Sequence, residues 1–97
     1  MNDSMIVPKG MEAQIANAFE AVKRVLDAAG ASFEDVVEMS SLHVGLQDQL
    51  DVFARVRDRY VKAPYPAQTA VGVAELGVPG AIVELKVQAR LPKGHRG

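Results

Sequence analysis

The sequence has 97 residues, 48% of them hydrophobic, and a formal net charge of −1. This length allows one small domain, which often completes its core by oligomerising. The near-neutral charge and the absence of tryptophan argue against a nucleic-acid partner. No apolar run is long enough to span a membrane, and the absence of cysteine favours a reducing compartment, so we expect a cytoplasmic protein.

The first half of the chain predicts a helix followed by a strand. Residues 1–10 form an irregular lead-in or a strand stub, and from Met11 the apolar period becomes helical, ending at Gly30. Ser32 can cap the turn that follows. A strand is expected from Val36 to Val44. The predicted buried stripe of the helix is Ile15, Phe19, Val22, Leu26 and Ala29, widened by Val25.

The second half predicts a helix and two strands. The helix extends from about Asp48 to Val61, and the strands span 67–74 and 81–90, with residues 91–97 as a flexible tail. Residues 77–80 have the composition of a hairpin turn between the two strands. The predicted buried stripe of this helix is Leu50, Phe53, Val56 and Tyr60, and the apolar face of the first strand is Ala67, Thr69, Val71 and Val73.

This order of elements predicts a single α+β domain over residues 1–97. Helices that connect strands imply crossovers, which place both helices on one side of a small mixed sheet. We expect the apolar strand faces to pack on the helices. The opposite face should meet water or another subunit.

Few residues carry candidate chemistry. His43 and His95 have no ligand partner at helical spacing, so neither a metal nor a cofactor is expected. Ser41 and His43 would share a strand face, which permits but does not require a nucleophile and its base. Arg57 is either part of a solvated helix face or an anion-binding group at a subunit boundary. Glu84 is either one member of an alternating polar row or a carboxylate that activates water.

Seven segments together resemble one known family. Their order and spacing are similar to those of the Rid (YjgF) family, whose best-known members are reactive-intermediate imine deaminases. The resemblance extends from Gly10 to Arg90. The matching segments are Gly10–Gln14, Val25–Ser32, Asp35–Val37, Phe53–Tyr60, Tyr65–Thr69, Val71–Leu76 and Val83–Leu85.

The resemblance implies a chorismate-mutase-like fold and a homotrimer with small-molecule clefts between subunits. In active members, an arginine of a Pro-Ala-Arg motif binds the substrate carboxylate and a glutamate on the last strand positions water. Glu84 corresponds to that glutamate if the preceding turn contains one inserted residue. Gln68 stands at the arginine position, Arg57 where active members have asparagine, and Ala70 where many have a small polar residue or cysteine.

The family pattern also begins with two further strands, and this chain starts after them. We therefore expect a divergent, N-terminally short member, with strand exchange or altered oligomerisation covering the open sheet edge.

Three functions stay open from the sequence. The first is a divergent Rid-like protein that binds a small molecule near Gln68 and Glu84 but does not deaminate amino-acid-derived imines. The second is an active imine or enamine hydrolase in which Arg57 supplies the missing charge. The third is a structural or interaction module without catalysis.

Overall fold

The first helix is the predicted one. The computed structural model describes residues 10–91, and within them helix α1 spans Met11–Ala28. Ile15, Phe19 and Leu26 are buried along one face, and Gly30 follows in the left-handed conformation with φ of 77°. Val25, expected to widen the buried stripe, is 69% exposed, so that part of the prediction is wrong.

A capped turn leads into the central strand. The Ser32 hydroxyl accepts a hydrogen bond from the Glu34 amide, and Asp35 accepts one from the Ser32 amide, so both ends of a capping box are present. The single 3-10 turn, η2 (Phe33–Asp35), is followed by strand β1 (Val36–His43). An irregularity in the register between Val36 and Glu38 shifts the alternation, so that Val37 is exposed.

Helix α2 spans Leu46–Tyr60 and begins two residues before the predicted start. Gly45 precedes it with φ of 82°, a conformation that favours glycine. The buried positions are Gln49, Phe53 and Val56, whereas Leu50 is exposed. The stripe is therefore rotated by one residue at its first turn, which places an amide in the core where a leucine was expected.

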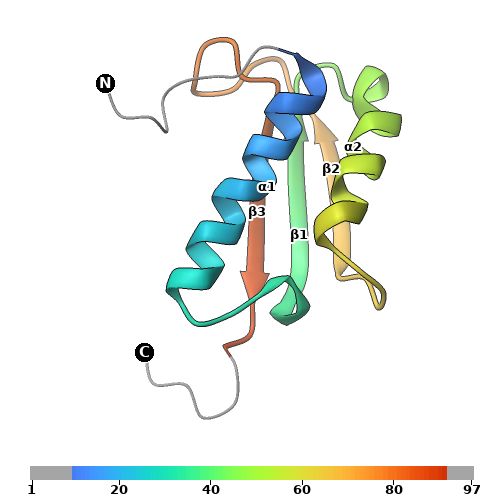
Figure 1. Ribbon diagram of the computed structural model, residues 1–97. Helices are drawn as coiled ribbons and strands as arrows, with labels where there is room; N and C mark the ends of the chain where they lie inside the picture. Colours follow the sequence, from blue (N-terminus) through green and yellow to red (C-terminus); the bar gives the residue numbers. More distant parts are fainter. Residues whose placement is uncertain (1–9, 92–97) are drawn as a thin grey trace.

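Within the described residues, the sheet has three strands in the order β2-β1-β3, where β2 is Ala67–Gly72 and β3 is Val83–Ala89 (Figure 1). Strand β2 pairs parallel to β1, and β3 pairs antiparallel to β1 on its other side. The predicted hairpin between the last two strands is wrong, because β1 lies between them. Helix α2 forms the crossover that makes β1 and β2 parallel, and residues 77–80 belong to a longer connection.

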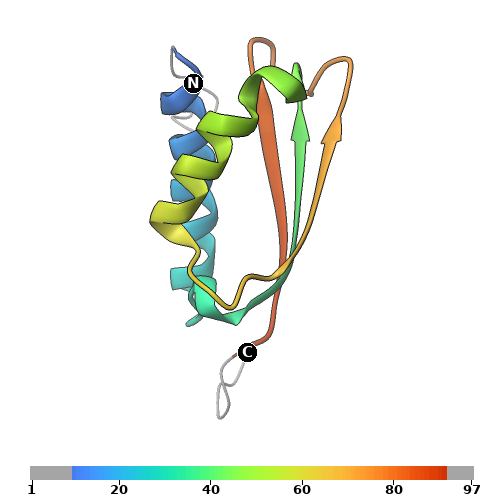
Figure 2. The same cartoon turned by 90° about the vertical axis from the view of Figure 1, so that its right-hand side faces the viewer.

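Both helices cover one face of the sheet and leave the other open, as Figure 2 shows. Phe19 lies at the centre of the core, stacked on Tyr60 with ring centroids 5.2 Å apart. This two-layer α+β arrangement confirms the predicted fold. The buried residues of the main cluster are Ile15, Phe19, Met39, Phe53, Val56, Val61 and Val83.

Strand β2 has the opposite orientation to the one predicted. Its register pairs Gln68 with Met39 and Ala70 with Ser41, and both of these β1 residues face the helices. The more apolar side of β2, with Thr69 and Val71, therefore lies on the open face of the sheet. Every residue of β2 is exposed, since this edge strand lies at the border of the helical layer.

Neither described helix is long and apolar enough to cross a membrane. The predicted lead-in and tail fall largely on residues 1–9 and 92–97, which lie outside the described part of the chain.

Candidate functional site

The predicted site residues are divided between the two faces of the sheet. Gln68 and Ala70 lie on the helix side of β2, as their pairing with β1 shows. Glu84 pairs with Leu42, which lies on the open side. One subunit therefore does not bring Gln68 and Glu84 together on one surface.

Gln68 is held by two hydrogen bonds. Its Nε2 atom donates to Ser41 Oγ at 3.2 Å and to the carbonyl oxygen of Thr69 at 3.2 Å. The side chain thus begins at an exposed edge strand and reaches a fully buried hydroxyl. The Gln68 amide is therefore a neutral group whose nitrogen is held by acceptors of the protein itself.

Behind Gln68 lies a buried polar network. Ser41 Oγ is 2.8 Å from His43 Nε2, and His43 Nδ1 is 2.8 Å from Gln49 Oε1. Gln49 Nε2 donates to the carbonyl oxygens of Val44 at 2.8 Å and Ile82 at 2.9 Å. Ser41, His43 and Gln49 are all essentially inaccessible to water, so this network connects the edge strand to the interior.

The sequence indicated part of this network. Alternation along the strand placed Ser41 and His43 on one face, and the 2.8 Å contact confirms it. Gln49 was missed because the apolar pattern favoured Leu50. The spacing of Gln49 from Phe53 and Val56, four and seven residues, is the helical period that could have identified it.

The Arg57 guanidinium contacts two residues that are close in sequence, Asp58 and Tyr65. Its guanidinium is hydrogen-bonded to Asp58 Oδ1 at 3.2 and 3.3 Å. The same group lies 5.5 Å from the centroid of the Tyr65 ring, within cation–π range. The Arg57 side chain remains 29% exposed.

The open face carries Glu84 in an alternating polar row with Lys86 and Gln88 on β3. Beside this row lies a surface cleft of about 340 Å³, lined by Glu38, Ser40, Lys86, Val87 and Gln88. Glu84 is not one of its lining residues, and its side chain is exposed.

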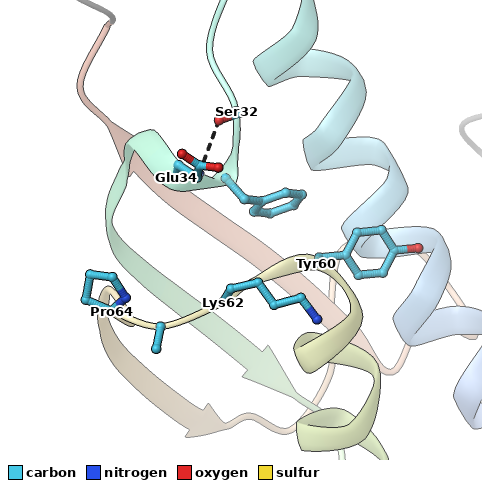
Figure 3. A pocket seen from close by; sticks show the side chains of 7 residues that line it. Ser32, Glu34, Tyr60, Lys62 and Pro64 are labelled. Atoms are coloured by element: carbon cyan, nitrogen blue, oxygen red, sulfur yellow. Dashed lines mark hydrogen bonds between the residues drawn. The ribbon is translucent and has the colours of Figure 1, made fainter.

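A second cleft, of about 430 Å³, opens where β1 and β2 begin (Figure 3). Two of its polar side chains already have partners: Lys62 donates to the Asp58 carbonyl, and the Tyr60 hydroxyl donates to Glu20 at 2.7 Å. Burial, and then the bond to Glu20, raise the pKa of Tyr60 above its ordinary value. The lining residues are Ser32, Phe33, Glu34, Tyr60, Lys62, Ala63 and Pro64.

A third cleft, of about 490 Å³, lies along the connection before β3. None of these three clefts has Gln68, Ala70, Arg57 or Glu84 in its wall. Within residues 10–91, no group of three or more histidine, aspartate and glutamate side chains is arranged to hold a metal.

Comparison with known proteins identifies relatives along almost the whole chain. Residues 1–91 match the family model described as endoribonuclease L-PSP. The RutC family protein YjgH of Escherichia coli is 37% identical over 81 residues, which cover 82% of this chain and 60% of that protein. A 2-iminobutanoate/2-iminopropanoate deaminase of Dermatophagoides farinae is 35% identical over 75 residues, covering 77% of this chain and 56% of that protein.

The solved structures of relatives have the same fold. The structure of protein YjgH superposes with a TM-score of 0.81 at 33% identity, covering 89% of this chain and 65% of that one. RidA from an Antarctic Psychrobacter superposes with a TM-score of 0.80 at 34% identity, covering 88% and 68%. The chain spans about 60% of the length of the curated relatives. The extent of the family match and the shared fold show that this chain belongs to the Rid (YjgF) family.

Proposed function

We propose that this protein is a divergent Rid-family member that binds a small molecule in a cleft between subunits and does not deaminate amino-acid-derived imines. The observation that carries this proposal is the hydrogen bonding of Gln68, the residue that the resemblance places at the position of the carboxylate-binding arginine. Its amide nitrogen donates to Ser41 and to Thr69 and carries no charge.

The electrostatic difference between the two residues is large. A guanidinium offers a positive charge and two parallel donors that match the two oxygens of a carboxylate. A carboxamide offers one NH₂ group, and both hydrogens of Gln68 already have acceptors. A bound carboxylate at this position would be neither neutralised nor held in a bidentate geometry.

The placement of Glu84 supports a cleft made by more than one subunit. Gln68 and Glu84 lie on opposite faces of one sheet, so only residues from neighbouring subunits could combine the two positions. The open sheet face is available for that contact (Figure 2). We infer a homotrimer, as the resemblance implies, and a cytoplasmic location, which the cysteine-free sequence supports.

A second candidate is an active imine hydrolase that uses Glu84 to position water and Arg57 to bind substrate. It is favoured by the relative from Dermatophagoides farinae that carries the deaminase name, and by the partial exposure of the Arg57 side chain. The bonds of Arg57 to Asp58 reduce the charge that it could offer.

The deciding experiment is an assay of 2-iminopropanoate hydrolysis, with the imine generated in the assay from alanine by an amino-acid oxidase. We expect no acceleration over buffer with the full chain. Gln68→Arg should introduce carboxylate binding, whereas Gln68→Met, of similar size, should not. Turnover by the unmodified chain would refute the proposal, and a raised KM in Arg57→Ala would then support the second candidate.

A further inference from the structure

The direction of each hydrogen bond in the buried network follows from the contacts of Gln49, its innermost residue. Gln49 lies within 2.8 and 2.9 Å of two backbone carbonyl oxygens, which can only accept. The amide group near those oxygens must therefore be the NH₂ group. The Oε1 atom of Gln49 must then be the one that faces His43.

The tautomer of His43 follows from this orientation of Gln49. Because Gln49 Oε1 only accepts, His43 Nδ1 carries the hydrogen of that 2.8 Å bond. His43 is fully buried and both ring nitrogens face neutral groups, so the neutral ring has the lower desolvation cost. In the neutral ring Nε2 has a lone pair, and it accepts the hydroxyl hydrogen of Ser41.

The outer end of the network is the contact between Ser41 and Gln68. Since the Ser41 hydrogen is engaged with His43, Ser41 Oγ can only accept, and it accepts from Gln68 Nε2. The second hydrogen of that amide goes to the Thr69 carbonyl. Turning the amide over would place two acceptor oxygens against each other at Ser41. Among residues 10–91, no donor contacts Gln68 Oε1.

We propose that this hydrogen-bond relay, from Gln49 through His43 and Ser41, makes Gln68 a hydrogen-bond acceptor toward the cleft. The ligand then presents a donor, such as an amine, amide or hydroxyl group, at the position that the resemblance assigns to the carboxylate-binding arginine. This inference rests on the proposed small-molecule cleft at Gln68. It names the class of group that the cleft selects.

The test uses two probes of similar size and opposite character, n-propylammonium and propionate, added to the full ¹⁵N-labelled chain. Binding is followed by the shift of the Gln68 side-chain NH₂ signals in ¹H–¹⁵N spectra, assigned with Gln68→Met. We expect n-propylammonium to bind about tenfold more tightly than propionate, as one directional hydrogen bond allows. A long-range ¹H–¹⁵N spectrum should show His43 protonated on Nδ1 and not on Nε2.

Two serine variants separate the relay from general effects of mutation. Ser41→Ala frees one amide hydrogen of Gln68, so the preference for n-propylammonium should fall toward unity. Ser40→Ala, on the open face of the same strand, is the matched control and should keep the preference. The size of the preference is compared only among variants whose backbone spectra remain those of the folded chain.

Equal binding of the two probes, or a hydrogen on His43 Nε2, would overturn the inference. Shifts with neither probe would overturn the cleft on which it rests. Imine turnover with an unchanged probe preference would refute only the proposed absence of deaminase activity.

Discussion

At the scale of single residues, the unusual feature is the polarity of part of the core. Ser41, His43 and Gln49 occupy interior positions that apolar side chains usually fill. Within the described part of the chain, no buried side-chain nitrogen or oxygen lacks a hydrogen-bond partner. A complete network of this kind restricts each side chain to one orientation, and losing one member leaves its neighbours unsatisfied.

Gln49→Leu tests this dependence. The substitution keeps the side-chain size but leaves His43 Nδ1 and the Val44 carbonyl without the partners that Gln49 supplies. We expect a loss of about 2–4 kcal/mol in the free energy of unfolding, measured by urea denaturation. Gln47→Leu, an exposed change on the same helix, should stay within about 0.5 kcal/mol. Similar losses in the two variants would show that the network is not required for stability.

At the scale of elements, α1 and α2 are joined by an aromatic cluster and by surface charges. Phe19 contacts the rings of Phe53 and Tyr60 with centroids 5.6 and 5.2 Å apart. Glu12 on α1 accepts hydrogen bonds from Arg59 at 2.7 Å and Arg55 at 3.1 Å on α2. The aromatic contacts stabilise the contact between the two helices more than the ion pairs do, because exposed ion pairs contribute little.

The Glu12 contacts nevertheless predict a pH dependence. The hydrogen bond from Arg59, followed by that from Arg55, lowers the pKa of the Glu12 carboxyl below its ordinary value of 4.5. Such a group stabilises the folded state above its unfolded pKa, and the contribution disappears as the pH falls through the lower folded value. The urea midpoint of Glu12→Gln should therefore be below that of the unmodified chain at neutral pH, and the difference should shrink at acidic pH as Glu12 becomes protonated.

The arginine partners supply the control for this comparison. In a chain that carries Arg55→Gln and Arg59→Gln, the further change Glu12→Gln should leave the midpoint unchanged at either pH. A persistent difference would mean that Glu12 acts through something other than these two arginines.

At the scale of the whole molecule, the helices cover one side of the sheet only (Figure 2). The open side carries Leu42, which is half-buried, and Val71, which is 44% exposed. These two residues are paired across β1 and β2 and form an apolar centre between polar neighbours. Apolar surface of this kind is what a subunit contact would bury.

Val71→Glu is expected to weaken self-association for this reason. The new carboxylate would lie on the open face, where burial against another subunit costs desolvation energy. Sedimentation velocity should show the unmodified chain as an oligomer and the variant shifted toward the monomer. Val25→Glu, at an apolar position on α1 that is still more exposed, should leave the oligomer intact. An oligomer that survives Val71→Glu would place the contact elsewhere.

The sequence by itself determined the local elements. The apolar period of α1, its end at Gly30 and the cap at Ser32 depend on residues within a few positions of one another, and each agrees with the structure. The order of elements predicted the two-layer α+β fold, which the structure confirms. The family resemblance predicts that Gln68 stands at the arginine position. Neither source indicated that Gln49 would enter the core, because its polarity opposed its helical spacing.

Only the tertiary structure decided which strands are neighbours and which way β2 faces. Strand β1 separates β2 from β3, and its register with β2 places Gln68 on the helix side, away from Glu84. Strand pairing joins residues that are distant in sequence, and shifting a register by one residue exchanges the two faces. Local alternation alone therefore cannot say which face of an exposed edge strand the helices will cover.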